Sequence, residues 1–171
     1  MNDIVGRIFM LILTVFAMFF VPVLTWTNSQ DDLVQGVVYT NTHELSSAVC
    51  EQGVLTANQY QMFLNELDST NLLYDVDVEI GHSTVVPVYD TAGAVTGTKT
   101  VDSIDYTDDV LSILFEGTGE YHLSRGDSIS ITVKSKELTL GQKARNAILH
   151  TSDYSSRIYA QCGGTVRDEK L

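Results

Sequence analysis

The sequence predicts an α+β protein in which an N-terminal transmembrane helix continues into an amphipathic helix and then into a small domain with an antiparallel sheet and short helices. Three observations predict this fold. An uncharged apolar run lies near the N-terminus, apolar residues then recur at helical spacing, and later segments alternate apolar and polar residues as strands do. A chain of 171 residues has room for one domain and an anchor.

The predicted transmembrane helix covers residues 8–26. Residues 8–23 read IFMLILTVFAMFFVPV without a charge, and Trp26 is typical of a membrane interface. At 1.5 Å per residue this stretch just crosses a hydrocarbon core of about 30 Å. The stub 1–7 contains Arg7 and is expected in the cytoplasm, so residues 27–171 are expected to form the extracytoplasmic domain. The large apolar side chains of this helix are expected to contact lipid or other helices; they include Phe9, Leu13, Phe16, Phe19 and Phe20.

A cleavable secretory signal is the alternative interpretation of the same segment. No A-x-A-like cleavage pattern follows the run, and the apolar stretch is longer than most signal cores. These two points favour a retained helix.

Helical spacing continues beyond the anchor as far as Gly53, which is expected to end the first helix. Thr56 and Gln59 then form a capping box, in which each side chain caps the backbone N–H of the other residue. The apolar residues behind this cap share one face of a second helix; they are Tyr60, Phe63, Leu64 and Leu67.

The pattern changes to a period of two from Tyr74 to Ile80, which predicts a half-buried strand. A separate stretch, 85–89, contains Pro87 and is expected at a sheet edge, with turns at Gly93 and Gly97 before a partner strand at 99–101.

A short helix is expected after Thr107, because acidic residues favour a helix start. Strands at 121–123 and 129–133 are expected to form a hairpin around the turn 124–127. Thr139 and Gln142 form a second capping box in front of a last helix, and residues 158–162 predict a final strand.

The charge balance excludes one class of partner. The chain carries 22 Asp and Glu against 10 Lys and Arg, a net charge of -12, which repels phosphate backbones, so no nucleic acid is expected. No motif indicates an enzyme, a cofactor or a metal: the histidines are widely spaced and no G-x-S-x-G elbow is present. Those histidines are His43, His82, His122 and His150.

Three further patterns have a functional and a plainer interpretation. Cys50 and Cys162 are candidates for a disulfide, since export would keep such a bond stable, with two buried thiols as the alternative. The acidic segment 102–109 lacks the spacing of a calcium loop, so a solvated loop and helix start is favoured. Arg125-Gly126-Asp127 matches an adhesion tripeptide, but Gly and Asp are also the residues of a tight turn.

The order of these parts resembles that of pilins and pseudopilins, and more narrowly that of TadE-like minor pilins and related pilus-assembly or conjugation-associated proteins of Gram-positive bacteria. The resemblance covers nearly the whole chain. It rests on a stub ending Gly6-Arg7, the apolar helix that runs on into an amphipathic one, and the segments VVYTNTHELSSAVCEQGVLTANQYQMFLNEL, YDVDVEI and LSRGDSISITV.

This resemblance implies a minor or priming subunit, or an anchored assembly factor, of a pilus or conjugation apparatus. Its partners would be the lipid bilayer and other pilin-like subunits or assembly proteins, contacted through the N-terminal helix. Processing between Gly6 and Arg7 would place Leu11 at the fifth mature position, where prepilins usually carry Glu, so assembly into a major filament is not implied. The alternative function is a single-pass anchored extracytoplasmic binding domain without catalytic activity.

Overall fold

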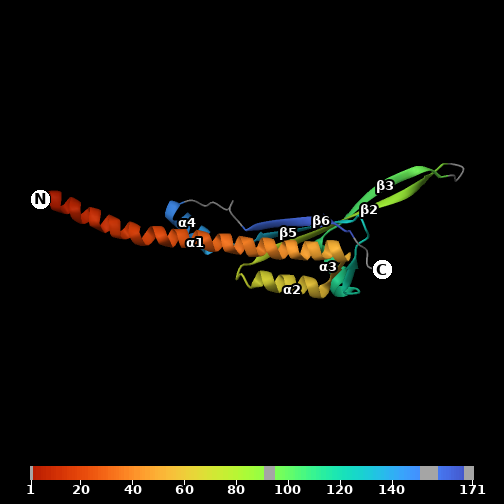
Figure 1. Ribbon diagram of the computed structural model, residues 1–171, viewed down its shortest axis with the longest axis horizontal. Helices are drawn as coiled ribbons and strands as arrows, with labels where there is room; N and C mark the ends of the chain where they lie inside the picture. The colour runs from red at the N-terminus through yellow and green to blue at the C-terminus, as the bar shows by residue number, and fades with distance from the viewer. Residues whose placement is uncertain (1, 91–94, 151–157, 168–171) are drawn as a thin grey trace.

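The computed structural model describes residues 2–90, 95–150 and 158–167, and it has the expected α+β fold. Its main element is α1 (Asn2–Gln52), a single helix of 51 residues that is about 76 Å long. The N-terminal half of α1 projects from the domain, and the C-terminal half lies along the sheet (Figure 1). The expected anchor and amphipathic helix are therefore one uninterrupted element, which ends where Gly53 takes a positive φ of 66°.

The most apolar part of α1 is Ile4–Pro22, and none of it is buried. By length and composition it meets the requirement for crossing a membrane, which a signal sequence near an N-terminus also meets. This stretch begins four residues before the expected span of 8–26.

Four antiparallel strands form the main sheet in the order β3-β2-β5-β6. The strands are β2 (Tyr74–Tyr89), β3 (Val95–Asp105), β5 (Ser128–Ser135) and β6 (Tyr159–Thr165). Val78 of β2 pairs with Ile131 of β5, which pairs with Cys162 of β6, so inward-facing residues are aligned across the sheet. The alternation predicted from Tyr74 to Ile80 is confirmed, since Val78 and Ile80 are fully buried.

One predicted pairing is wrong. The strands around the turn 124–127 do not form a hairpin: β4 (Glu120–His122) pairs with β1 (Val54–Thr56) in a separate two-stranded sheet, while β5 pairs with β2 and β6. Gly53 turns the chain back just before β1, and the backbone N–H and C=O groups of β1 then form their hydrogen bonds with β4.

The three shorter helices begin and end near the expected residues. Both predicted capping boxes are present, at the start of α2 (Ala57–Asp68) and of α4 (Leu140–Leu149). In α3 (Thr107–Glu116) two acidic residues occupy the first turn, as expected from the favourable interaction of carboxylates with a helix N-terminus.

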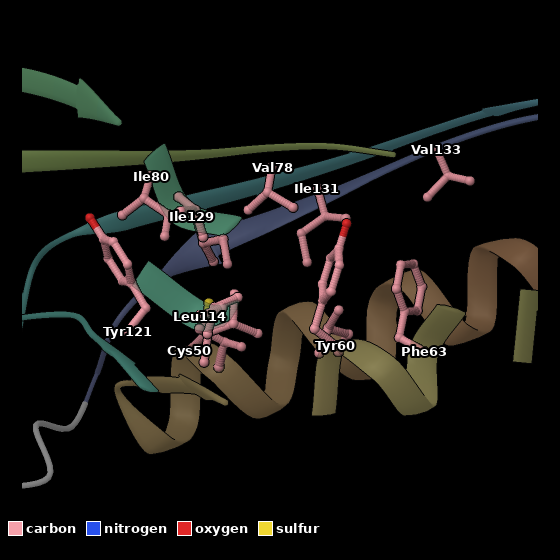
Figure 2. Packing of buried hydrophobic residues seen from close by; sticks show 14 of the residues in the cluster. Cys50, Tyr60, Phe63, Val78, Ile80, Leu114, Tyr121, Ile129, Ile131 and Val133 are labelled. Carbon is pink, nitrogen blue, oxygen red and sulfur yellow. The ribbon is translucent and has the colours of Figure 1, made fainter. Parts of the chain in front are cut away.

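The core lies between one face of the sheet and the helices α1, α2 and α3. In Figure 2, strand residues such as Val78 and Ile131 point towards Tyr60 and Phe63 of α2. The domain half of α1 contributes residues at helical spacing to the same core; they are Val38, Leu45 and Val49. The sheet's other face is polar along β5, where Ser128, Ser130, Thr132 and Lys134 alternate with the buried residues.

Beyond Gly81, β2 and β3 leave the sheet as a two-stranded hairpin at the end of the molecule opposite the N-terminus (Figure 1). The expected edge strand at 85–89 is thus the continuation of β2, and Pro87 pairs with Thr98 of β3. Gly97 lies within β3 and not at a turn, whereas Gly93 is outside the described residues. Both faces of this hairpin are exposed, including Val85 and Val101.

Candidate functional site

The first candidate site is the face of α1 that the domain leaves uncovered. Val34, Val38 and Val49 point into the domain, so the opposite side of the helix is open. Apart from the adjacent pair Gly36 and Val37, residues on that side follow each other every three or four positions from the apolar N-terminal half into the domain half. We call them the open stripe: Ile4, Ile8, Leu11, Val15, Phe19, Pro22, Trp26, Ser29, Leu33, Gly36, Val37 and Thr40.

The open stripe carries no charge and stays exposed next to the domain. Leu33 is 69% and Val37 45% exposed, and both line a shallow groove of about 380 Å³ together with Gly36 and Thr40. A Cβ atom on Gly36 would meet nothing within 4 Å. A glycine inside a helix costs about 1 kcal/mol relative to alanine, and no contact within the described chain requires one here.

The projecting half of α1 holds the residues expected to contact lipid or other helices. Phe9 is 65%, Leu13 52%, Phe16 60% and Phe19 71% exposed. Phe20 is half-buried because its ring stacks on that of Phe16, with centroids 5.0 Å apart. The proposed processing residues Gly6 and Arg7 lie inside α1.

The second candidate site is a polar cluster where the hairpin leaves the sheet. The sequence places its four members far apart: His82 in β2, Asp105 at the end of β3, Tyr121 in β4 and Asp127 before β5. His82 Nδ1 lies 2.7 Å from Asp127 Oδ2, and His82 Nε2 lies 2.8 Å from the Tyr121 hydroxyl. That hydroxyl donates to Asp105 Oδ2 at 2.6 Å. We call these four residues the His82 cluster.

The hydrogens available in the His82 cluster determine which atom donates in each contact. Asp127 Oδ2 also accepts the Ser124 backbone N–H at 2.8 Å, so it acts as an acceptor. The single Tyr121 hydrogen is used on Asp105, so the contact with His82 Nε2 needs a hydrogen from the imidazole. The contact between His82 Nδ1 and Asp127 Oδ2 likewise needs one hydrogen between its two atoms.

Burial and the neighbouring carboxylates keep the Tyr121 hydroxyl protonated. Tyr121 is 5% exposed, and burial, followed by the hydrogen bond to Asp105 and its negative charge, raises the pKa of the Tyr121 hydroxyl far above its usual range. Such a hydroxyl stays protonated and serves as a hydrogen-bond donor. The cluster therefore ties the base of the hairpin to β4 and to the turn before β5.

This raised pKa predicts a loss of stability in alkali. The unfolded tyrosine ionises near pH 10, whereas folded Tyr121 holds its proton to higher pH, so its stabilisation is complete below about pH 10 and is lost above it. One such group contributes a slope of up to about 1.4 kcal/mol per pH unit. We expect the free energy of unfolding, measured in urea and detergent between pH 9 and 11, to fall less steeply with pH for Tyr121→Phe, because this variant lacks about one proton that is released on unfolding. Equal slopes would contradict this, since Tyr60 and Tyr74, whose pKa values burial also raises, remain in both proteins.

The two cysteines are free and buried, so the expected Cys50–Cys162 disulfide is not supported. Burial raises the pKa of both thiols; for Cys50 the nearby Arg167 opposes this effect. Cys50 Sγ instead occupies the space beside β6 where a Cβ on Gly164 would come within 2.8 Å of it. Both side chains act as small buried apolar groups.

The remaining sequence patterns have structural roles. The carboxylate of the Arg125-Gly126-Asp127 tripeptide belongs to the His82 cluster and Asp127 is 4% exposed, so the interpretation as a turn is confirmed. In the acidic segment 102–109, Asp102 accepts from Ser83, while Asp108 and Asp109 lie in the first turn of α3. Within 2–90, 95–150 and 158–167, no group of three His, Cys, Asp or Glu residues is placed to hold a metal ion.

The sequence patterns did not reveal the His82 cluster or the domain half of the open stripe, which is formed by Leu33, Gly36, Val37 and Thr40. His82 lies two residues beyond Ile80, on the face that strand alternation already marks as inward. This position was the one sign in the sequence that His82 lies against the domain. Its partners are 23 to 45 residues away, and no local spacing reveals them.

No protein-family model, curated protein or solved structure matches the chain.

Proposed function

We propose that the protein is a membrane-anchored, pilin-like structural subunit or assembly factor of a pilus or conjugation apparatus, similar to the TadE-like proteins of Gram-positive bacteria. The stub 1–7 would be cytoplasmic and the domain extracytoplasmic, which allows its incorporation into a surface filament. The protein would act by binding its neighbours and not by catalysis.

The observation that carries this proposal is the continuity of α1. No residue of its apolar stretch Ile4–Pro22 is buried, and its second half is part of the domain core without a break between them. A tether that only retains a binding domain needs no fixed geometry, and a flexible linker serves it well. A rigid helix fixes the orientation of the domain relative to the anchor, which matters when several such helices pack side by side.

Breaking the continuity of α1 tests this proposal. We expect a flexible six-residue Gly-Ser insertion after Thr27 to abolish assembly or transfer while membrane retention and domain folding persist. A Gly-Ser segment of n residues is a random coil with an end-to-end distance of about 5 Å × √n, so it does not keep the orientation of the helix. The readouts are surface filaments or transfer frequency, membrane fractionation, and protease resistance of the domain. The matched control is a helical insertion of 18 residues, about five full turns, which restores the facing of the helix.

A second variant tests the anchor itself. Phe16→Asp places a charge in the middle of the apolar stretch and is expected to abolish membrane retention and assembly, whereas Phe16→Leu should keep both. Survival of filaments or transfer with Phe16→Asp, or with the flexible insertion, would overturn the subunit proposal.

The alternative is an anchored binding domain, and the projecting hairpin favours it. Exposed valines on β2 and β3, among them Val85 and Val101, lie at the end opposite the anchor, where a partner could reach them. This alternative expects the flexible insertion to be tolerated, so the same experiment separates the two functions.

A further inference from the structure

We propose that a second copy of this chain packs against the domain half of the open stripe, with Leu33, Gly36, Val37 and Thr40 of the two α1 helices facing each other. This contact lies outside the apolar stretch Ile4–Pro22. The inference rests on the proposed anchoring of the protein in a membrane, and it names the partner of the exposed helix face.

Gly36 is the first argument. It is exposed, it lies in the interior of a helix, and its missing side chain leaves a groove between Leu33, Val37 and Thr40. A small residue on an exposed helix face lets another helix approach closely. Two large, exposed apolar side chains beside it, Leu33 and Val37, supply the surface that such an approach would bury.

The charge of the protein is the second argument, and it favours a second copy. With a net charge of -12, most ways of pairing two copies bring like charges together. The open stripe carries no charge from Ile4 to Thr40, so two copies can meet along it without that repulsion. Asp32 lines the groove, and exposed Glu44 lies on the same side of α1 one turn beyond Thr40, so such a contact would bring both acidic residues near their counterparts.

The third argument is height above the membrane. Two copies anchored by the same apolar stretch of an uninterrupted helix hold each residue at the same level, about 1.5 Å per residue beyond Pro22. Residues 33–40 of one copy therefore meet residues 33–40 of the other about a two-fold axis along the membrane normal. A self-complementary patch of small and apolar residues suits that symmetry.

Cysteine cross-linking of the full chain in membranes tests this arrangement. Val37→Cys is expected to form a disulfide-linked dimer on mild oxidation, because a residue near the two-fold axis meets its own counterpart. Tyr39→Cys is the matched control: Tyr39 is also exposed, at 52%, but lies about 200° around the helix from Val37. The unmodified chain, whose two cysteines are buried, gives the background.

Two further variants separate contact from folding. Adding Gly36→Leu to Val37→Cys should lower the cross-linked fraction about tenfold by blocking close approach, although leucine has the better helix propensity by about 1 kcal/mol and has open space around it. Asp32→Asn should raise the fraction by removing like-charge repulsion at the rim. Equal cross-linking at positions 37 and 39, or no effect of Gly36→Leu, would overturn the inference.

These outcomes are distinct from a failure of the proposed function. Cross-linking at Val37 in a strain without any filament or transfer defect would support the dimer and remove the assembly role. A protein required for assembly that shows no cross-link at Val37 would retain the proposed function and remove the α1 contact.

Discussion

Asp127→Ala is expected to destabilise the domain by about 3 kcal/mol, because it removes a buried carboxylate and leaves the hydrogen-bonding groups around it without their partner. Asp127 is 4% exposed and accepts hydrogen bonds from the Ser124 backbone and from His82. Alanine leaves the Ser124 N–H without its acceptor and His82 without its nearest carboxylate. The free energy of unfolding in urea, measured on the full chain in detergent, checks this expectation.

The effect should be strongest at the base of the hairpin. With the His82 cluster opened, backbone amides of β2 and β3 near His82 and Ser103, which pair with each other, are expected to exchange hydrogen faster than those of β5 and β6. Asp127→Asn is the control, since an amide oxygen can still accept from Ser124, and it should cost less than alanine. A change below about 0.5 kcal/mol for Asp127→Ala, typical of an ordinary surface residue, would show that the cluster does not fasten the hairpin.

Gly163→Ala is expected to cost about 2–3 kcal/mol, because the new methyl group has no room against the backbone of β5. A Cβ on Gly163 would lie 2.5 Å from the carbonyl oxygen of Ile129 and 3.3 Å from the Cα of Ser130. Neither atom can rotate away as a side chain would, so β6 must shift from β5 and from the domain half of α1. Thermal or urea unfolding of the full chain measures the loss.

Gly97→Ala is the matched control for this substitution. Gly97 also lies within a strand, β3, but a Cβ there would meet nothing within 4 Å. Alanine at that position should be neutral or slightly stabilising, by up to about 1 kcal/mol, because it restricts the unfolded chain. Similar losses at Gly97 and Gly163 would mean that strand propensity, and not close approach of β6 to β5, explains the effect.

Local patterns in the sequence were sufficient to predict the helices. The capping boxes at Thr56 and Thr139 involve residues three apart, and both have the expected bonds. Gly53 ends α1 as predicted because it supplies the positive φ that other residues rarely adopt. The strand at Tyr74 was equally readable, since alternation of period two follows from the backbone alone.

Strand pairing and the polar cluster depended on contacts that the sequence does not encode locally. The segments 121–123 and 129–133 looked like a hairpin, yet β4 pairs with β1, some 65 residues before it, as in the match of Leu55 with Tyr121. The turn residues between them serve the His82 cluster instead of a hairpin. Cys50 and Cys162 illustrate the same limit, because their pairing depends on three-dimensional positions that spacing cannot supply.

The uninterrupted α1 also makes the protein a lever. Val49, near the end of the core, lies 27 residues beyond Pro22, or about 40 Å along the helix axis. Transmembrane helices tilt by about 20° on average, and such a tilt would carry the far end of α1 sideways by about 14 Å. Under the proposed anchoring, a small change in bilayer thickness or in helix packing near Ile4–Pro22 would be amplified into a large displacement of the hairpin. Pro22 lies inside α1 and lacks the N–H that would bond to the fourth preceding residue, so it is the position where α1 bends most easily.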